Sequence, residues 1–480
     1  MKNKLVTTAI DYVNGAPHLG HALEKIYADV YARHLRKKHA VYFLTGTDEN
    51  SLKNVRAAEK AGVSTEEFVL KNSLKFQELK TALNLSYNDF IRTTEERHVK
   101  GVQKLWKLAK KDIYKKNYKG LYCVSCEEYY KEDDLKCPIH KTELEEIEEE
   151  NYFFKLSKYQ DKILDLIEKD EVQIIPQARK NEILNFIKSG LQDFCISRTS
   201  ERAKGWGIDV PNDPNQKIWV WFDALANYMT ALSKEDFDKF WINGDVIHII
   251  GKDIVRFHAV YFIGILLALN FKLPKKIVTH GFITVDGEKM SKTISNVIDP
   301  FDLVLRYGRD PLRYFLLSEF KTTADGDFSY EKFEKKYHAD LSSGLGNLVS
   351  RILTMIEKKD LKGSTIVVDF SFKEEIKKYV LKYEKHLNDF EFNESINIIW
   401  EMQRFLDKYI EEKKPWEVTD RKELVLIFSK LVYALRKIAL MLDVFLPETS
   451  EKILSFLGED ESKIDVIKKE MLFPRLNEYG

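Results

Sequence analysis

Two short segments, far apart in the sequence, carry side chains suited to binding a polyphosphate. The first is His18-Leu19-Gly20-His21, where a predicted loop enters a predicted helix. The N–H groups at the start of a helix favour anions, and two imidazoles there would add hydrogen-bond donors. Gly20 leaves room for a nucleotide to lie against the backbone. Taken alone, the segment has a plainer interpretation, in which His18 caps the helix and His21 is an ordinary surface residue.

The second segment is Asp286-Gly-Glu-Lys-Met-Ser-Lys-Thr293, which follows a predicted strand and a predicted turn at Asp286-Gly287. Lys289 and Lys292 lie in a loop of small residues, so their ammonium groups can swing onto a polyphosphate. Such point charges suit the negative charge that develops on a leaving pyrophosphate. On its own, however, a loop of this kind is more often a solvated pair of lysines.

Four further side chains have the spacing of a metal site. Cys123-x-x-Cys126 is followed, after ten residues, by Cys137-x-x-His140. Two such pairs can converge on one ion as a tetrahedral set of three sulfurs and one nitrogen, which structural Zn²⁺ prefers. Four protein ligands leave no open position, so the zinc would be structural. The alternative is three unrelated thiols beside a histidine. The remaining cysteine, Cys195, is predicted to be a buried apolar residue.

Composition limits the partners and the compartment. The 480 residues contain 76 Lys and Arg against 76 Asp and Glu, so any nucleic acid must be attracted by local basic surface. The most apolar stretch, Ala259–Phe271, is shorter than the roughly 20 residues of a membrane span. Met1–Val6 lacks the layout of a signal peptide. We therefore expect a cytoplasmic protein.

The elements that must position these groups begin with a βαβ unit. An apolar run at Leu5–Ile10 predicts a strand, apolar residues at helical spacing predict a helix over Leu19–His34, and Val41–Leu44 predicts a second strand. Such a unit implies a parallel sheet, whose ligands bind at the carboxyl ends of the strands. The segments 17–21 and 46–48 both lie at that edge.

The rest of the chain divides into an insertion, a second half of the sheet and a helical part. The region from Tyr118 to about Asn151 resembles an insertion, and its Glu143–Glu150 run is most simply a solvated face. Later strands of the sheet are predicted at Ile218–Phe222, Val246–Ile250 and Lys276–Thr279. From about Asp340 onward, the spacing of apolar residues predicts a bundle of amphipathic helices, in segments that include 341–355, 379–410 and 424–446.

Taken together, the two polyphosphate-binding segments resemble the HxGH and KMSKS signatures of the class I aminoacyl-tRNA synthetases. Seven residues match position for position, and Thr293 replaces the final serine, which the family tolerates; the matching residues are His18, Gly20, His21, Lys289, Met290, Ser291 and Lys292. The flanking segments are similar to those of methionyl-tRNA synthetases, in the short bacterial form with one zinc knuckle. These segments are 12–21, 46–49, 220–225 and 251–254, the last leading to Phe257-His258.

The resemblance implies an activity and a set of roles. The enzyme would form methionyl-adenylate and pyrophosphate from methionine and Mg²⁺-ATP, then transfer methionine to the 3′ end of its tRNA. His18, His21, Lys289 and Lys292 would be catalytic, and these four with Asn14, Gly20 and Asp253 would bind ATP. Asp48 would hold the methionine ammonium, and Arg198 would act near its carboxylate. The side-chain pocket would comprise Ile10, Tyr12, Trp221, Leu225, Tyr228, Phe257, His258 and Tyr261.

Each aromatic residue of that pocket has core packing as its alternative explanation, so the prediction depends on the whole set. Aromatic edges do suit a flexible thioether. One departure stands out, because the family usually continues Gly-Thr-Asp-Glu with His-Gly, and this chain has Asn50-Ser51. The resemblance also supports zinc at the Cys-Cys-Cys-His set, and the short insertion leaves no room for a separate editing domain.

In the helical part, Asn347, Arg351 and Trp416 match anticodon-binding elements of the family. Asn347 and Arg351 are four residues apart and so share a helix face. Amide and guanidinium groups can read the edges of unpaired bases, and an indole can stack on one. The alternative for Trp416 is a core position in the bundle. The lysines of Lys107–Lys119 could favour the tRNA acceptor end, although a solvated face is the simpler explanation.

The predicted fold is a Rossmann-like α/β catalytic domain, split by a zinc-binding insertion and followed by an all-α bundle. The domain order is a first catalytic half (1–115), the insertion (116–215, knuckle at 123–140), a second half with the KMSKT loop (216–298), a stem-contact segment (299–337) and the anticodon-binding domain (338–480). We expect a monomer. The alternatives are another class I synthetase, or a non-catalytic tRNA-binding paralogue, against which the two intact signatures argue.

Overall fold

The structure is a computed structural model that describes residues 2–123, 128–130, 136–137, 143–290, 296–466 and 471–476. The chain forms two compact units. Unit 1 comprises Met1–Ala28, Leu35–Lys80 and Leu85–His280, and unit 2 comprises Asp29–His34, Thr81–Asn84 and Gly281–Gly480.

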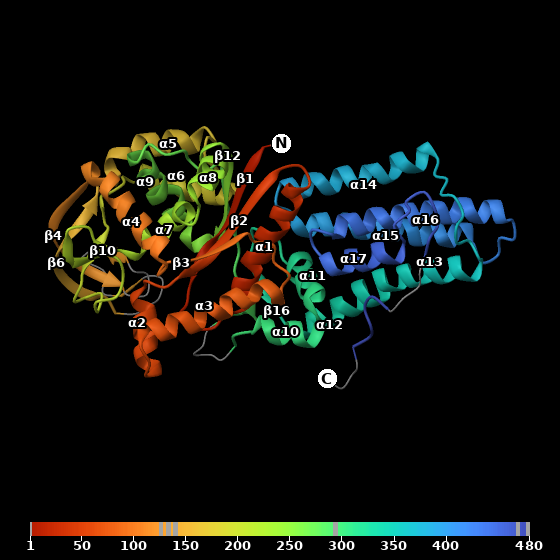
Figure 1. Cartoon of the computed structure of the whole chain (residues 1–480), viewed down its shortest axis with the longest axis horizontal. Helices are drawn as coiled ribbons and strands as arrows, with labels where there is room; N and C mark the ends of the chain where they lie inside the picture. The colour runs from red at the N-terminus through yellow and green to blue at the C-terminus, as the bar shows by residue number, and fades with distance from the viewer. Residues whose placement is uncertain are drawn as a thin grey trace. The chain divides into compact units, whose positions relative to one another are not determined.

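Unit 1 is built on a parallel sheet of six strands (Figure 1). Its spatial order is β3 (Asp89–Arg92), β2 (Ala40–Asp48), β1 (Asn3–Tyr12), β12 (Gly244–Gly251), β13 (Lys276–His280) and β7 (Gln173–Ile175). All five strand pairs are parallel. The order reverses at β1, from which β2 and β3 extend to one side and β12 and β13 to the other, as in a Rossmann-like fold, and β7 is added outside β13. The strands predicted at Leu5–Ile10, Val41–Leu44, Val246–Ile250 and Lys276–Thr279 are confirmed.

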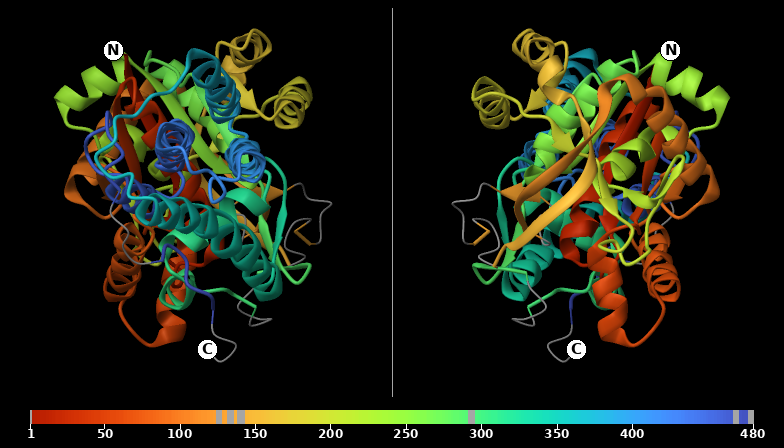
Figure 2. Two further views of the ribbon diagram at one scale, coloured as in Figure 1. Left: turned by 90° about the vertical axis from the view of Figure 1, so that its right-hand side faces the viewer. Right: turned by 90° about the vertical axis from the view of Figure 1, so that its left-hand side faces the viewer.

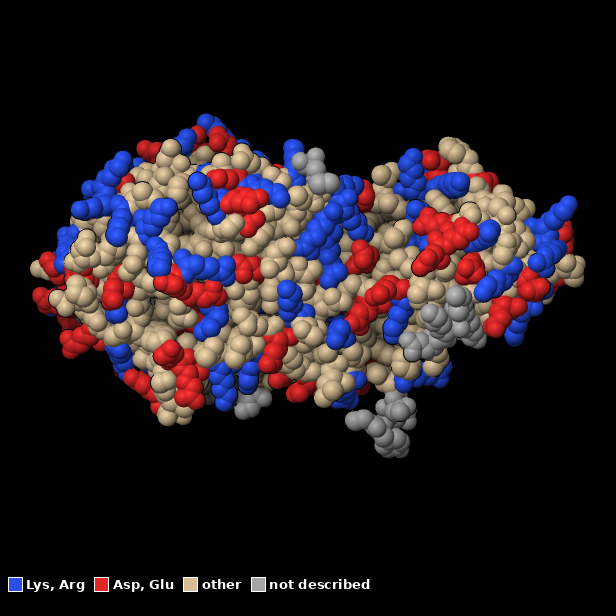
Figure 3. Space-filling model, in the orientation of Figure 1, with Lys and Arg blue, Asp and Glu red and all other residues tan. Residues whose placement is uncertain are grey.

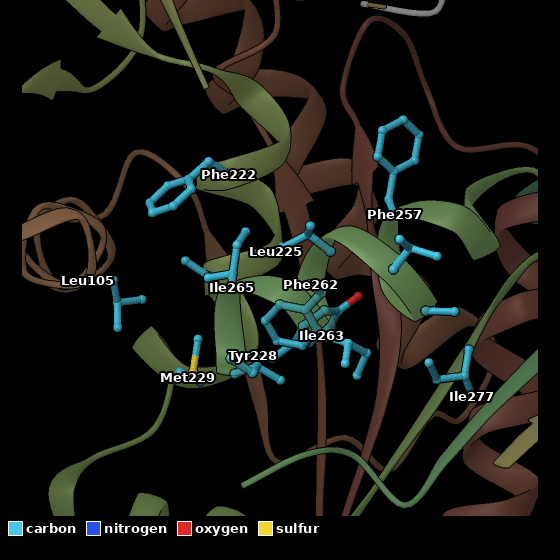
Figure 4. Close-up of a cluster of buried hydrophobic side chains, with 14 of the residues drawn as sticks. Leu105, Phe222, Leu225, Tyr228, Met229, Phe257, Phe262, Ile263, Ile265 and Ile277 are labelled. Carbon is cyan, nitrogen blue, oxygen red and sulfur yellow. The ribbon is translucent and has the colours of Figure 1, made fainter. Parts of the chain in front are cut away.

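The helices of this region are α1 (Leu19–Arg36), α2 (Leu52–Ala61), α3 (Thr65–Ala82), α4 (Glu96–Leu108), α5 (Gln160–Glu168), α6 (Gln177–Lys188), α7 (Val220–Thr230), the short α8 (Lys234–Asp236) and α9 (Ile263–Ala268). Apolar side chains of α4, α7, α9 and the sheet form one buried cluster (Figure 4). Leu105, Phe222 and Ile277 belong to it. Burial of this apolar surface stabilises the unit and packs α7 against α4 and β1.

The prediction of a sheet strand at Ile218–Phe222 is wrong. Ile218 ends β11 (Asp213–Ile218), which pairs antiparallel with β10 (Asp209–Val210) and β9 (Ser197–Thr199) in a separate small sheet. Val220 then starts the buried helix α7. A short apolar run of this kind can be a buried strand or a buried helical turn, and periodicity cannot distinguish them. The sheet instead gains β7, which lies inside the range 116–215 predicted for the insertion.

The insertion contains a long two-stranded ribbon, β4 (Ile113–Cys123) paired antiparallel with β6 (Glu145–Phe154) (Figure 2). The short strands β5 (Glu128–Tyr130) and β8 (Phe194–Cys195) complete this sheet. The glutamate run is therefore the partner strand of the lysine-rich strand. Lys119 pairs with Glu146 at 3.1 Å and Lys115 with Glu150 at 3.2 Å, so part of the basic charge is neutralised locally.

Unit 2 begins with a small sheet of β15 (Glu288–Lys289), β14 (Ile283–Val285) and β16 (Gly326–Phe328). The helices α10 (Pro300–Tyr307), α11 (Arg309–Glu319) and α12 (Tyr330–Lys336) follow, then a π-helical turn at Tyr337–Gly346. The long helices come last: α13 (Asn347–Lys358), α14 (Phe370–Asn388), α15 (Phe392–Lys413), α16 (Arg421–Leu442) and α17 (Pro447–Phe456). Helices α14, α15 and α16 pack alongside one another, which confirms the predicted bundle (Figure 1).

Two expectations from the composition concern the distribution of surface charge and the presence of a membrane span. Lys, Arg, Asp and Glu are interspersed over the face shown in Figure 3, as their equal numbers suggest. Within the part of the chain that the structure describes, no helix is both long and apolar enough to cross a membrane.

Candidate active site

The two histidines of the HLGH segment are held by the backbone of their own turn. The carbonyl of His18 accepts the N–H groups of His21 at 3.0 Å and Ala22 at 3.2 Å, which starts α1. Nδ1 of His18 accepts the N–H of Gly20 at 3.1 Å, so His18 does cap the helix. Nδ1 of His21 accepts the N–H of His18 at 3.0 Å. Neither ring is therefore an unconstrained surface group.

These bonds determine the tautomers of both rings. A backbone N–H can only donate, so Nδ1 of His18 and of His21 must be unprotonated, and the neutral rings carry their proton on Nε2. The two rings stack with their centroids 3.7 Å apart and their planes at 25°. The pair therefore presents two Nε2–H donors at the start of a helix, which is the arrangement that an anion requires.

Charged residues lie next to this pair of histidines. They were not among the site residues predicted from the sequence. Asp11, near the end of β1, forms a close ion pair with the buried Lys25 of α1. Asp11 also lies 3.9 Å from Nε2 of His21. Burial raises the pKa of Asp11, against the opposing effect of the Lys25 ammonium. The signal available in the sequence was a lysine among the apolar residues of a predicted helix.

A second buried pair joins α1 to the end of β13. Nε2 of His280 lies 2.9 Å from Oε2 of Glu24, and both residues are buried. Oε1 of Glu24 has no hydrogen-bond partner among the described residues. A buried carboxylate oxygen without a partner is costly, and such a group commonly faces a ligand or an ordered water.

The ends of β1 and β2 bring two predicted methionine-binding residues together. Tyr12 and Asp48 are partners in the parallel register. Asp48 is buried, and its Oδ1 accepts the backbone N–H of Asn50 at 3.2 Å. The ammonium of Lys53 lies over the Tyr12 ring, 4.3 Å from its centroid. A carboxylate next to an aromatic surface is suited to an amino acid whose ammonium group and apolar side chain must both be bound.

The departure at Asn50-Ser51 has a clear local structure. Ser51 is the N-cap of α2 and accepts the N–H of Lys53 at 3.0 Å. The side-chain amide of Asn50 donates to Oδ2 of Asp223 at 2.7 Å and to the carbonyl of Thr93 at 3.2 Å. The loop after Asp48 is thus capped and cross-linked, with different residues from those usual in the family.

The predicted methionine pocket is partly a continuous stack of rings. Trp221 of α7 stacks on Phe257, with centroids 3.7 Å apart and planes at 5°. Phe257 meets Tyr261 edge to face at 5.2 Å. Leu225, also on α7, is buried in the apolar cluster of Figure 4. Ile10 packs against that cluster. Six of the eight pocket residues therefore come from α7 and the π-helical turn at Phe257–Phe262, namely Trp221, Leu225, Tyr228, Phe257, His258 and Tyr261.

The most buried residues of the predicted methionine pocket are Tyr228 and His258. Nδ1 of His258 lies 2.9 Å from the carbonyl of Ile254, so it must carry the proton and donate. Nε2 of His258 then accepts the hydroxyl of Tyr228 at 2.7 Å. Burial lowers the pKa of His258 to about 4, so the ring is neutral at pH 7. The pair is therefore uncharged and hydrogen-bonded internally, which would suit an apolar thioether.

The two residues predicted on the carboxylate and ATP side lie at different depths. Arg198, on β9, is buried, and its guanidinium lies 5.8 Å from the centroid of the Trp219 ring. Asp253 is exposed in the short helical turn Lys252–Ile254 that directly follows β12. Since β12 neighbours β1 in the sheet, Asp253 lies at the strand-end edge where nucleotides bind in such folds.

The KMSKT segment follows a tight hairpin in unit 2. Asp286 and Gly287 have φ of 51° and 81°, as a type I′ turn requires, which confirms the predicted turn. Oδ1 of Asp327 accepts the N–H of Gly287 at 2.7 Å and the hydroxyl of Thr284 at 2.8 Å. Lys292 lies outside the described residues, as does the side chain of Lys289.

The metal prediction falls partly outside the described residues, which do not include Cys126 and His140. Cys123 ends β4, and Cys137 follows a bridge between Lys136 and Glu143. Both cysteines are buried, although they belong to an insertion rich in charged residues. Cys195 is buried as predicted, and its thiol donates to the carbonyl of Ser197 at 3.1 Å.

The three predicted anticodon residues lie in the helical bundle. Asn347 and Arg351 are on α13, and Asn347 is exposed. Trp416 is 45% exposed, so the alternative of a core position is wrong. The Arg351 guanidinium lies 5.9 Å from the centroid of the Trp416 ring. Arg351 also forms an ion pair with Glu411. An exposed indole beside a guanidinium is suited to stacking on a base.

Two family models match the chain. One, described as "tRNA synthetases class I (M)", matches residues 4–146 and 133–353. The other, "Anticodon-binding domain of tRNA ligase", matches residues 369–474. Together they cover both units.

The chain belongs to the methionyl-tRNA synthetase family. It is 40% identical over 503 residues to the methionine–tRNA ligase of Fusobacterium nucleatum, covering all of this chain and 79% of the relative. It is 41% identical over 477 residues to that of Brucella suis, covering 95% and 92%. The Mycobacterium tuberculosis methionyl-tRNA synthetase in complex with methionyl-adenylate is similar in structure, with a TM-score of 0.92, 35% identity and coverage of 99% and 100%. The chain is accordingly an ATP-dependent methionine–tRNA ligase.

Proposed function

We propose that methionine is activated at the carboxyl ends of β1, β2 and β12, and that separate residues there bind ATP and methionine. The observation that carries this proposal is the pair of stacked rings at His18 and His21. Both of their Nδ1 atoms accept backbone N–H groups, so each neutral ring carries its proton on Nε2. They lie at the start of α1, where the helix dipole also favours a phosphate. Asn14, in the loop before α1, and Gly20, in the first turn of α1, would also contact the nucleotide.

Methionine is held at its two ends. The buried carboxylate of Asp48 pairs with the substrate ammonium, and Arg198 acts near the substrate carboxylate. The side chain lies among Tyr12, Trp221 and Phe257, above the neutral Tyr228–His258 pair. Because that pair is already hydrogen-bonded internally, it offers the thioether an uncharged surface and no strong donor. Packing against aromatic rings then supplies the affinity for methionine.

The first reaction is an in-line displacement at phosphorus. A carboxylate oxygen of methionine attacks the α-phosphorus of ATP, the bond between that phosphorus and the bridging oxygen breaks, and pyrophosphate leaves. The Nε2–H donors of His18 and His21, with the ammonium groups of Lys289 and Lys292, stabilise the charge on the pentavalent phosphorus and the leaving group. Mg²⁺ enters with ATP, and Asp253 contacts the nucleotide. No protein group forms a covalent intermediate, so positioning and electrostatics supply the catalysis.

The second reaction transfers the aminoacyl group to tRNA. A hydroxyl of the terminal ribose attacks the carbonyl carbon of methionyl-adenylate and AMP leaves. Asn347, Arg351 and Trp416 contact the anticodon, and the segment 299–337 contacts the acceptor stem. The exposure of Trp416 and its neighbouring guanidinium support the anticodon role. We further propose that the enzyme acts in the cytoplasm as a monomer, which light scattering would test.

Zinc in the insertion would be held by Cys123, Cys126, Cys137 and His140. Buried thiols in a short, highly charged segment fit this role, because such a segment has little apolar core of its own. A bound ion would fix the two ends of the knuckle and take no part in the reaction.

Methionine-dependent exchange of pyrophosphate into ATP tests the activation step. We expect methionine to support exchange at a rate at least about 100-fold above leucine, isoleucine, valine or cysteine. Asp48→Asn should raise the KM for methionine about tenfold or more, since a hydrogen bond or ion pair to a charged group is lost. Preference for another amino acid would indicate a different class I synthetase, and absence of exchange with all five would indicate a non-catalytic paralogue.

A further inference from the structure

The side chain of Asn50 links two parts of the proposed methionine site. Its backbone N–H donates to Oδ1 of Asp48 at 3.2 Å. Its side-chain amide donates to Oδ2 of Asp223 at 2.7 Å and to the carbonyl of Thr93 at 3.2 Å. Asp223 lies on α7 between Trp221 and Leu225. One residue thus connects the loop of the ammonium-binding carboxylate to the helix that lines the side-chain pocket.

The second carboxylate oxygen of Asp223 is also hydrogen-bonded, to a residue of α4. Asp223 is fully buried, and its Oδ1 lies 2.5 Å from Nε2 of the fully buried His98 on α4. Nδ1 of His98 lies 2.6 Å from the hydroxyl of Thr230, at the end of α7. A buried carboxylate is stable only when donors satisfy its oxygens. His98 satisfies one oxygen of Asp223, and Asn50 satisfies the other.

The Asn50 amide is not needed to fold its own loop. Ser51 already caps α2, and the amide of Asn54 donates to the carbonyl of Asp48 at 2.9 Å. The indole N–H of Trp206 donates to the carbonyl of Glu49 at 2.8 Å. The backbone on both sides of Asn50 is therefore anchored without its side chain. What the amide adds is the bond to α7, together with the bond to the carbonyl of Thr93.

We propose that Asn50 is a positioning residue for methionine, which sets the spacing between the carboxylate of Asp48 and the ring-bearing face of α7. Asn50 does not touch the substrate. It acts by clamping Asp223, so that the ammonium group and the side chain of one amino acid can be bound at the same time. This inference rests on the roles proposed above for Asp48 and α7.

The first test is Asn50→Ala in the exchange assay, with the full-length enzyme. We expect the KM for methionine to rise about tenfold, because a hydrogen bond to a charged group is lost from the framework of the pocket. The KM for ATP and kcat should change by less than about threefold. The matched control is Gln403→Ala, which removes a buried amide bonded to the carboxylate of Asp407 in the helical bundle. It should leave the KM for methionine unchanged, whatever its effect on the melting temperature.

Swapping the side chains at positions 50 and 223 distinguishes a loss of their interaction from a general loss of stability. Asn50→Asp places two carboxylates face to face, and Asp223→Asn leaves two amides facing each other, so each alone should raise the KM for methionine. The double variant again pairs one amide with one carboxylate, and the side chain at position 223 can still accept from His98, while the bond from position 50 to the Thr93 carbonyl stays lost. Its KM should fall back by about tenfold relative to the worse single variant. Recovery of this kind requires the two side chains to act on each other.

The results separate three kinds of failure. An unchanged KM for methionine in Asn50→Ala, or a double variant no better than the worse single variant, would overturn the inference about Asn50. A wild-type enzyme without methionine-dependent exchange would overturn the proposed function itself. If the wild-type enzyme exchanges normally and Asp48→Asn does not change the KM for methionine, Asp48 does not bind methionine. The proposed role of Asn50 then has no basis.

Discussion

Nδ1 of His21 accepts the backbone N–H of His18 at 3.0 Å, so the second histidine of the signature is oriented by the first. The bond fixes the proton of His21 on Nε2 and holds the ring against that of His18. A role as helix cap and a role in binding phosphate are therefore compatible, because they use opposite nitrogens of the same ring. This separation allows the two roles to be tested with different side chains.

Replacing His21 with Gln or with Asn should separate the donor from the acceptor. The amide nitrogen of Gln can approach the position of Nε2, whereas the amide oxygen of Asn replaces Nδ1. We expect His21→Asn to keep the melting temperature but to lower kcat for exchange roughly 100-fold, the usual loss for one donor to a developing charge. His21→Gln should lose less, about tenfold. Higher activity in the Asn variant would contradict the assignment of Nε2–H as the catalytic donor.

Asp327 should affect catalysis although it lies outside the KMSKT segment in the sequence. It anchors the Asp286-Gly287 turn that leads into the KMSKT segment. Asp327→Ala should slow single-turnover adenylate formation about tenfold with little change in methionine affinity, as should Lys292→Ala, because both affect the charge delivered to pyrophosphate. Asp327→Asn keeps an oxygen acceptor for Gly287 and is the control. Stopped-flow measurements that show equal rates for all three Asp327 proteins would refute this anchoring role.

The zinc prediction can be tested with the cysteines of this chain alone. Elemental analysis of the purified protein should find about one zinc per chain. Cys123→Ser should lose it, whereas Cys195→Ser should retain it, since Cys195 is a buried residue outside the knuckle. Full zinc content in Cys123→Ser would show that Cys123 is not a ligand.

Trp416→Ala should separate tRNA charging from amino-acid activation. Stacking on a base is worth roughly 1–3 kcal/mol, so charging should weaken about tenfold or more. Exchange needs no tRNA and should be nearly unchanged. Trp400→Ala is the contrasting control, because Trp400 is buried and donates to the Tyr314 hydroxyl at 2.8 Å. That variant should lower the melting temperature and both activities together. The same pattern in Trp416→Ala would show that Trp416 only contributes to packing.

Stability should fall when the medium becomes acidic, and His258 is one cause. Burial lowers its pKa from 6.5 to about 4, so the unfolded chain binds a proton that the folded chain excludes. The contribution of His258 to the free energy of unfolding keeps its full value above pH 6.5. It decreases as the pH falls toward 4, by up to about 3 kcal/mol. Melting temperatures from pH 7.5 to pH 4.5 should therefore decrease, and His258→Gln should show a shallower dependence. An equal slope in both proteins would exclude this contribution.

Several features could be predicted from the sequence because they are local. The first βαβ unit, the Asp286-Gly287 turn and the helical bundle follow from residue periodicity and turn chemistry over a few consecutive residues. The signatures at 18–21 and 289–292 are contiguous, so their match to the family needs no structure. The burial of Cys123, Cys137 and Cys195 also agrees with what their residue type suggests.

Other features were decided by the tertiary structure, because they depend on which distant groups meet in a water-free interior. Ile218–Phe222 is apolar enough for a strand, yet its second half becomes a helix that packs on α4 and the sheet. Asn50 and Asp223 are 173 residues apart, and Asp223 and His98 are 125 apart. No local pattern predicts such partners. Burial then strengthens each of these hydrogen bonds, since water no longer competes for the polar groups.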